Sequence, residues 1–461
     1  MNKQSHSALL WIVAAGFFMQ ALDTTIVNTA LPNMAAALHV GALDMRPVVV
    51  AYALVMAMLT PASGWLADKF GTRRVYFTAI LIFVLGSLFC ATAHTLNELV
   101  IARVLQGVGG SMLLPIGRLA LLRSVSSEEY IGALAFVSIA GQVGPLLGPV
   151  LGGWFVETIG WHWIFLINIP IGAFGLFAVR RFLPAGAPVA PPPFDVIGFG
   201  LLSVSMASVS LALDCPVETH RALISSILFA VFVLTVVLYL LHAQRRPLPL
   251  FDLALFRERN FSVGLIGNLV ARVGSSALPF LLPLLLQVQL GYSPLQSGLV
   301  MLPIAIVGTI AKRWVTPLIL RYGYETFLLV NTLIVGGSIA SCALISPGWP
   351  LALSLVQLAI FGATNSMQFA AMNSVTLKGL TPAQAGSGNS LFSMIQMLAM
   401  SLGVTIGGSL VGVFARHFDS TGLGYRLSFA CVGTITLLSA FVFRYLNAPS
   451  ARNTQPAVAR G

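Results

Sequence analysis

The sequence is dominated by long apolar runs that short polar segments separate. A bilayer's hydrocarbon core is about 30 Å thick, and about 20 apolar residues cross it as a helix whose backbone groups are all paired. With 57% hydrophobic and 8% charged residues and a mean hydropathy of +0.90, the chain is too apolar for an ordinary soluble domain. We therefore predict an all-α polytopic membrane protein. The fourteen predicted spans are 9–31, 47–66, 75–93, 96–122, 131–157, 163–183, 196–213, 222–242, 261–288, 295–320, 326–346, 350–373, 387–414 and 425–446.

Basic residues are distributed unevenly between the two sets of loops. The termini and the loops on their side hold sixteen Lys and Arg, the opposite loops hold four, and five lie within spans. Because cytoplasmic loops carry the excess of basic residues, both termini are predicted to be cytoplasmic. This bias accounts for the formal charge of +11, and no basic run with interleaved aromatic residues indicates nucleic-acid binding. The first span is too long for a signal-peptide core, so we expect it to remain in the protein.

Several chemistries lack the residues that they need. The four cysteines, Cys90, Cys215, Cys342 and Cys431, show no metal-binding or redox spacing. No Gly-Lys dipeptide is present, which argues against a P-loop and ATP-driven transport. No carboxylate pair or Ser/His/Asp constellation suggests catalysis. We therefore expect no enzyme activity, no cofactor and no metal.

Two polar segments divide the chain into a six plus two plus six arrangement of spans. The first is the proline-rich linker 184–193, and the second is the charged segment 242–260. The predicted domains are an N-terminal six-helix bundle (1–183), a linker with two inserted helices and a cytoplasmic loop (184–260), a C-terminal six-helix bundle (261–446) and a cytoplasmic tail (447–461). If the bundles are repeats, the segment Asp68-Lys69-Phe70-Gly71 corresponds to Leu320-Arg321-Tyr322-Gly323, which keeps the base, the aromatic residue and the glycine.

Asp23 is a carboxylate deep inside the first span. A charge there costs at least about 2.5 kcal/mol unless it faces a protein interior or a wet cavity. Gln20, Thr24 and Asn28 share a helical arc of roughly 140° with it. This polar stripe is either a packing surface or, as we favour, part of a proton or substrate site.

A second polar stripe lies on the fourth span and includes Arg103, Gln106 and Arg118. At about 1.5 Å per residue, Asp23 and Arg103 lie roughly 12 and 10 Å below the outer ends of their spans. Their depths match, so we predict an Asp23–Arg103 contact. Protonation of Asp23 would release it, as a proton-coupled switch requires; the alternative is a permanent structural ion pair.

Arg272 lies near the midplane of the ninth span, about 16 Å from its start, with no acidic neighbour in sequence. Arg118, Lys312 and Arg313 lie nearer to cytoplasmic ends, where long side chains can reach the interface. The substrate cavity is predicted to include Gln20, Thr24, Asn28, Gln106 and Arg272. Because the deep charges are Asp23 against two arginines, an anionic or neutral substrate is favoured over a lipophilic cation.

Two further motifs indicate helix contacts. Small residues and two prolines on the fifth span predict a hinge-like contact, because small side chains let helix backbones touch: Gly141, Gly144, Pro145, Gly148, Pro149, Gly152 and Gly153. The loop between the second and third spans combines an acid with bases and predicts an ionic latch: Gly64, Asp68, Gly71, Arg73 and Arg74. There Asp68 could face a neighbouring helix N-terminus.

Together these motifs resemble the major facilitator superfamily and its fourteen-span drug:proton antiporter branch. The loop from Gly64 to Arg74 resembles the signature between spans two and three. Arg103 with Gln106-Gly107 resembles the span-four proton-coupling motif, Gly141 to Gly153 the antiporter motif, and the segment from Leu22 to Asn28 the span-one signature of the branch. Within it, the chain is most similar to enterobacterial multidrug-resistance transporters.

The resemblance implies two six-helix bundles that rock about a central cavity, proton-motive force as the energy source, and a bacterial inner membrane. We hypothesise a monomeric proton-coupled exporter in which Asp23 carries the proton and Arg103 tunes it. Several members of the branch have acids in span thirteen, whereas residues 391–414 contain none, so multivalent cationic drugs fit less well. The alternatives are an exporter of an anionic metabolite such as a small carboxylate and, more remotely, a non-transporting scaffold or sensor.

Overall fold

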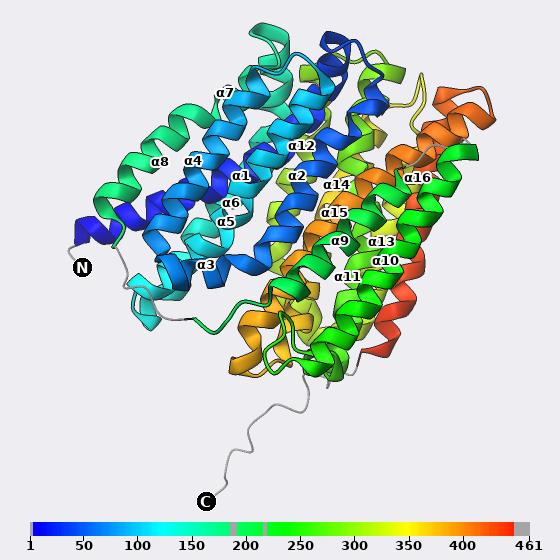
Figure 1. Cartoon of the computed structure of the whole chain (residues 1–461). Coiled ribbons are helices and arrows are strands. Elements are labelled where there is room, and N and C mark those ends of the chain that lie inside the picture. Colours follow the sequence, from blue (N-terminus) through cyan, green and yellow to red (C-terminus); the bar gives the residue numbers. More distant parts are fainter. Residues whose placement is uncertain (1–2, 185–190, 215–218, 447–461) are drawn as a thin grey trace, which may run out of the picture.

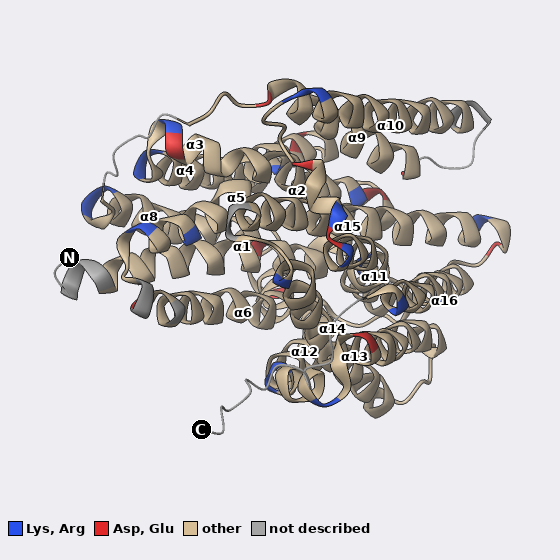
Figure 2. Ribbon diagram, turned by 90° about the horizontal axis from the view of Figure 1, so that it is seen from below, with Lys and Arg blue, Asp and Glu red and all other residues tan. Residues whose placement is uncertain are grey.

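A computed structural model describes residues 3–184, 191–214 and 219–446, and these ranges contain helices and no strands (Figure 1). Twelve helical segments within them are long and apolar enough to cross a membrane. The all-helical polytopic class is therefore confirmed, and charged residues are sparse along the ribbon (Figure 2). The predicted linker residues 185–190, the tail 447–461 and Cys215 lie outside the described residues.

We call the helices that precede residue 184 the first half. They are α1 (Lys3–Ala37), η1 (Ala42–Met45), α2 (Arg46–Leu59), η2 (Thr60–Ala62), α3 (Ser63–Phe70), α4 (Thr72–Ala91), α5 (Leu96–Ser124), α6 (Ser127–Thr158), α7 (Trp163–Leu166) and α8 (Asn168–Phe182).

The middle pair is α9 (Val196–Leu213) and α10 (Thr219–Arg245), followed by η3 (Leu253–Arg257). It lies at one edge of the molecule, with α9 against α2 and α15 (Figure 2). Asp195, which is 3% exposed, precedes α9 and accepts hydrogen bonds from Gly198 N (3.1 Å) and Leu250 N (3.0 Å) and shares one with His242 Nε2 (2.7 Å). This carboxylate therefore joins α9, α10 and the segment that follows them.

The second half comprises α11 (Arg259–Leu284), the π-helical turn η4 (Leu285–Gln289), α12 (Pro294–Ala311), η5 (Lys312–Trp314), α13 (Val315–Ser341), η6 (Cys342–Leu344), α14 (Leu351–Lys378), α15 (Pro382–His417), α16 (Thr421–Ser439) and η7 (Ala440–Tyr445). The twelve candidate spans include one 51-residue segment, Pro294–Leu344, which covers two of the predicted runs. They do not include the 28-residue helix α14. The described residues thus give twelve candidates where the sequence predicts fourteen.

The suggested repeat has a backbone counterpart. Gly71 precedes α4 with φ 85° and ψ 139°, and Gly323 interrupts α13 with φ 79° and ψ 164°. Both angles lie where residues with a side chain are strained, which explains a glycine at each place. The two aligned segments therefore share the same break between successive helices.

The two halves share two hydrophobic cores, a larger one at one end of the molecule and a smaller one toward the other end. α1 begins and η7 ends toward the lower end in Figure 1, which we call the termini end; the opposite end is the far end. One core combines buried residues of α1, including Leu22 and Ile26, with residues of α11, including Leu278. Two other cores hold buried residues of a single half, such as Ile116 of α5 or Phe327 of α13.

Further contacts between the halves lie at both ends of the molecule. Gln287 Nε2 donates to Thr29 O (2.9 Å), and Leu295 N donates to Glu157 Oε1 (2.8 Å). Toward the termini end, Ala57 of α2 packs with α15, and Lys312 Nζ contacts Gln142 Oε1 at 3.0 Å. The halves therefore touch at both ends, with the larger shared core and two hydrogen bonds at the far end.

A candidate proton-coupling site

Close contact with α6 fixes the part of α1 that carries Asp23. A Cβ on Gly144 would lie 2.6 Å from Leu22 N, and a Cβ on Gly148 would lie 2.1 Å from Thr25 Oγ1. Thr25 Oγ1 also lies 3.4 Å from Gly144 O. Such distances leave no room for a side chain, so these two helices touch along their backbones.

The remaining motif residues extend this contact. A Cβ on Gly152 would lie 2.5 Å from Ile26 O, whereas one on Gly153 would lie 2.3 Å from Pro294 O, in the second half. Gly141 has more room, 3.6 Å from Phe17, and Pro145 and Pro149 lie within α6 without ending it. The motif therefore serves two interfaces, one with α1 and one with α12.

Asp23 is fully buried and accepts hydrogen bonds from three side chains. Arg103 Nη1 lies 2.7 Å from Oδ2, while Gln106 Nε2 and Asn168 Nδ2 lie 2.8 and 3.3 Å from Oδ1. The structure thus brings together the two depth-matched charges, from α1 and α5. It adds an amide from α8 that sequence reasoning missed.

Arg103 is 1% exposed and is held on several sides. Its Nη1 also donates to Gln106 Oε1 (2.7 Å), its Nε donates to Val48 O (3.0 Å), and the guanidinium lies 4.1 Å from the centre of the Tyr52 ring. A buried ion pair offsets its desolvation cost only with such additional hydrogen bonds. Arg103 therefore keeps polar partners that do not depend on Asp23.

Ser87 and Cys90 of α4 complete the cluster. Ser87 Oγ lies 2.8 Å from Gln106 Nε2 and 3.3 Å from Asn168 Nδ2, and Cys90 Sγ lies 3.6 Å from Gln106 Oε1. Each is a lone small polar residue in an apolar helix, a pattern too common to single out. Asn168 is a more distinctive residue, because it is an amide between two isoleucines in the apolar segment Ile167-Asn168-Ile169-Pro170, and the sequence could have indicated it as a polar contact.

The other polar residues of α1 do not join this cluster. Gln20 Nε2 contacts Met56 Sδ at 3.5 Å, and Thr24 Oγ1 donates to Gln20 O at 2.8 Å. Gln20 Oε1 and Asn28 Oδ1 are buried without a hydrogen-bond partner in the described part of the chain. The predicted stripe therefore divides, with Asp23 facing α4, α5 and α8 and Gln20 contacting α2.

Arg272 of α11 is partly buried against an aromatic ring. Its guanidinium carbon lies 3.5 Å from the centre of the Phe369 ring, and its Nε lies 3.3 Å from Asn268 Oδ1. Within residues 3–184, 191–214 and 219–446, no carboxylate pairs with it. Among the described residues, Arg272 is therefore a cation with an aromatic partner and no anionic one.

Three further basic residues near the termini end have separate surroundings. The Arg118 guanidinium lies 5.8 Å from the centre of the Phe17 ring, and its Nε is buried without a partner among the described residues. Arg313 is exposed and lies over Trp314 at 4.3 Å. Lys312, described above, contacts α6 across the halves.

The predicted latch includes a basic residue, Arg123, that the sequence analysis does not name. Asp68 pairs with Arg123 at the end of α5, and Arg123 Nη1 also donates to Thr72 Oγ1 (2.8 Å). Arg73 instead donates to Arg180 O at the end of α8. Sequence reasoning missed Arg123 because it lies 55 residues from Asp68. A Cβ on Gly64 would meet nothing within 4 Å, so this structure places no steric demand on that glycine.

In the parts of the chain that the structure describes, no group of three His, Cys, Asp or Glu residues could hold a metal ion. The site instead combines one buried acid, one buried base and neutral hydrogen-bonding groups. Chemically, this arrangement can take up or release a proton inside an apolar helical protein.

A membrane protein of packed apolar helices with an ionisable cluster in its interior has the architecture of a secondary transporter. Residues 13–404 match the Major Facilitator Superfamily. The chain belongs to this family. It is a multi-pass membrane transporter of small molecules and not an enzyme.

Curated relatives match nearly the whole chain. It is 49% identical over 443 residues to "Putative multidrug resistance protein MdtD" of Citrobacter koseri, covering 94% of this chain and 93% of that protein. It is 48% identical over 460 residues to the protein of the same name from Escherichia coli O1:K1 / APEC, covering 98% and 96%. The resemblance to enterobacterial multidrug-resistance proteins is confirmed.

Solved transporters share the fold at low sequence identity. An auto-inhibited peptide transporter of the POT family superposes with a TM-score of 0.74 at 14% identity, covering 97% of this chain and 99% of that one. A bacterial homologue of the human lysosomal transporter Spinster gives 0.67 at 14% identity, covering 98% of each chain. These likenesses support the fold alone.

Proposed function

We propose that the chain is a proton-coupled exporter that works by alternating access in a bacterial inner membrane. In this proposal it is a monomer with fourteen spans, and both termini are cytoplasmic. Two six-helix bundles, the first and second halves, move about a central substrate cavity, and the middle pair is inserted between them. Family membership and the excess of basic residues on the termini side support this arrangement.

The observation that carries the proposal is the fully buried Asp23 carboxylate, hydrogen-bonded to Arg103, Gln106 and Asn168. Protonation would remove its charge and leave the Arg103 guanidinium buried without an anion. An uncompensated buried charge is strongly destabilising. Proton uptake by Asp23 is therefore expected to favour rearrangement of α1 against α5.

The contacts of Arg103 limit the size of that rearrangement. Gln106 Oε1 and Val48 O can still accept hydrogen bonds from the guanidinium after Asp23 is neutral. We infer that Asp23 is the proton carrier and that Arg103 tunes its proton affinity. The α6 glycines transmit the movement, because α6 contacts both α1 and α12.

The location of the larger shared core suggests which side of the membrane is more tightly closed. The larger of the two cores that the halves share lies at the far end, together with the hydrogen bonds of Gln287 and Glu157. The smaller shared core, which includes Ala57, lies toward the termini, where two further cores belong to a single half each. With cytoplasmic termini, this arrangement corresponds to closure on the outer side. Two contacts would then stabilise the loop between α3 and α4 on the cytoplasmic side. They are the ion pair of Asp68 with Arg123 and the hydrogen bond from Arg73 to Arg180 O.

The decisive experiment measures proton-driven uptake of a radiolabelled, neutral amphipathic drug into everted membrane vesicles. Asp23→Asn is expected to abolish the uptake that a proton gradient drives, because the amide cannot carry the proton. Asp419→Asn, at an exposed aspartate of the far end, is the matched control and should transport normally. Undiminished coupling in Asp23→Asn would overturn the assignment.

Drug efflux is the first substrate proposal, because the relatives carry the name of multidrug resistance proteins. Export of an anionic metabolite such as a small carboxylate is the second. It is favoured by Arg272, which stacks on Phe369 without an acidic partner in the described residues and could bind an anion and an aromatic group together.

Arg272→Ala separates these two substrates. Loss of export of radiolabelled small carboxylates with unchanged drug tolerance supports the anion, and the reverse supports the drug. Arg416→Ala, at an exposed arginine of the far end, is the control for a general loss of positive charge.

A further inference from the structure

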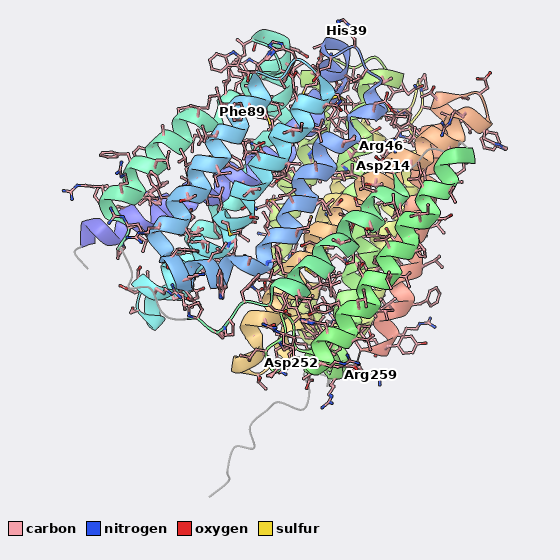
Figure 3. The ribbon with its side chains drawn as sticks, viewed as in Figure 1. His39, Arg46, Phe89, Asp214, Asp252 and Arg259 are labelled. Atoms are coloured by element: carbon pink, nitrogen blue, oxygen red, sulfur yellow. The ribbon has the colours of Figure 1, made fainter. Side chains whose placement is uncertain are left out.

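Arg46 lies at the far end of the molecule, where the first half, the middle pair and the second half meet (Figure 3). It begins α2, and its Nε donates to Leu43 O at 2.9 Å. Its Nη1 donates to Ser409 Oγ of α15 at 2.7 Å and lies 3.2 Å from Asp214 Oδ1, directly after α9. One guanidinium therefore contacts all three parts of the chain.

The surface of α15 accommodates the Arg46 side chain. A Cβ on Gly408 would lie 2.1 Å from Arg46 Cδ, so a larger residue at 408 would displace the arginine stem. The Arg46 and Asp214 side chains are 14% and 31% exposed. The pair is thus partly screened from water while Asp214 still reaches solvent.

α9 is attached to α15 independently of Arg46. Ser409 Oγ donates to Leu213 O at 3.0 Å, and Ser210 and Ser401 share a buried hydrogen bond of 3.1 Å. Movement of α15 is therefore expected to carry α9 with it. Asp214 then lies on the second-half side of the seam between α2 and α15.

Two other far-end hydrogen bonds between the halves do not involve α9 or α10. Gln287 contacts Thr29 across the α1–α11 seam, and Glu157 contacts Leu295 N across the α6–α12 seam. Each involves one side chain and one backbone group. The Asp23–Arg103 and Asp68–Arg123 ion pairs join helices of the same half, whereas the Arg46–Asp214 pair joins different parts of the chain.

We propose that Arg46 is a positioning residue for transport that holds the far end of the α2–α15 seam closed. Ser409 and Asp214 are its partners, and α9 is the brace that presents the acid. This inference rests on the proposed alternating access. Opening of the far end breaks the contacts of Arg46 with Ser409 and Asp214, while the Ser210–Ser401 contact persists. The middle pair therefore sets the balance between the two conformations without touching substrate.

Distances between spin labels test this proposal in the full-length protein. Labels at Ala37→Cys, at the end of α1, and Arg416→Cys, near the end of α15, report the separation of the two halves at the far end. They are introduced into a cysteine-free background in nanodiscs. Arg46→Met and Ser409→Ala are compared with Arg426→Met, the matched control. Arg426 is also a far-end arginine that donates to a backbone carbonyl, Ala343 O, but within the second half.

Arg46→Met is expected to raise the population with the longer distance by about three- to tenfold, since it removes a hydrogen bond and a partly exposed ion pair. Ser409→Ala should shift the distances in the same direction by less, and Arg426→Met should leave them unchanged. An unchanged distribution in both Arg46→Met and Ser409→Ala would overturn the proposal. So would an equal shift in Arg426→Met.

The measurement separates this proposal from the proposed function. Spin-label distances report the conformational balance without substrate or proton gradient, whereas the Asp23→Asn assay reports coupling. If Asp23→Asn retains coupling while Arg46→Met shifts the distances, the proton assignment fails and the brace stands. If coupling is lost in Asp23→Asn while the distances in Arg46→Met are unchanged, the brace alone fails.

Discussion

In the first half, the polar core around α4 and α5 contains a carboxylate and a guanidinium, whereas the second half packs amides and a hydroxyl between α13 and α14. Asn331 Nδ2 donates to Gln368 Oε1 (2.7 Å) and Thr364 O (2.9 Å), and Gln368 Nε2 donates to Thr332 Oγ1 (2.5 Å). Asn331, Thr332 and Gln368 are at most 4% exposed.

This comparison shows that neutral groups alone can hydrogen-bond across a buried helix pair in this fold. Replacing a buried ion pair by neutral residues of similar size is often stabilising, so packing does not require Asp23 and Arg103 to be charged. The charge of the first half therefore indicates a function that the second-half cluster cannot perform. Protonation is the change that an amide cannot undergo.

The largest expected effect comes from breaking the charged pair on one side. Arg103→Met leaves the Asp23 carboxylate buried without its cation and should destabilise the protein by about 3–5 kcal/mol. Thermal unfolding in detergent measures this loss. The double variant Asp23→Asn/Arg103→Met should recover most of it, because no lone charge remains. A double variant as unstable as Arg103→Met would show that the loss comes from packing and not from charge.

The glycine contacts of α6 and α15 offer a second comparison. Gly144→Ala places a methyl group 2.6 Å from Leu22 N, beside Asp23, and Gly403→Ala places one 2.5 Å from Val273 O. Each should destabilise the protein by about 1–3 kcal/mol through overpacking. Only Gly144→Ala should alter the pH dependence of transport in everted vesicles. An equal change in pH dependence in Gly144→Ala and Gly403→Ala would show that proton coupling is not specific to the first half.

Removing an amide from the neutral cluster should have a smaller effect. Gln368→Leu leaves Asn331 Nδ2 with one fewer acceptor and Thr332 Oγ1 without the amide donor, at a cost of about 1–3 kcal/mol. The expected result is a lower unfolding temperature with unchanged proton dependence of transport. A changed proton dependence would mean that the second half also takes part in coupling.

The smallest effect concerns Asp195, a carboxylate outside the charged cluster. Burial alone would raise the pKa of Asp195, but hydrogen bonds from His242, Gly198 N and Leu250 N hold it below its ordinary value. Its stabilisation is therefore present above the ordinary aspartate pKa of about 4 and is lost as pH falls through the lower pKa of the folded protein. Unfolding temperatures measured between about pH 3 and 7 should fall less steeply for Asp195→Asn than for the unchanged protein. Identical slopes would contradict this role.

The sequence predicts the helical class and the Asp23–Arg103 contact because apolar run length and residue depth are local properties. It does not predict Asn168, Ser87 or Arg123 as partners, since packing between distant helices sets their positions. The cluster of Asn331 and Gln368 is not predicted for another reason. Neither residue is ionisable or lies in the same predicted span as a charged residue, so nothing distinguishes these amides in an apolar span. The three-way position of Arg46 depends on α9 lying across a seam, which composition does not reveal.

Cys90 gives the cluster a chemical reporter of its own. The thiol is fully buried, and its sulfur lies 3.6 Å from Gln106 Oε1. Gln106 also donates a hydrogen bond to Asp23, so Cys90 and Asp23 share a neighbour. A thiol reagent can reach Cys90 only when water and small molecules reach the surroundings of Gln106. The rate at which Cys90 is alkylated therefore reports how often water reaches the buried carboxylate, and no label has to be introduced near the site.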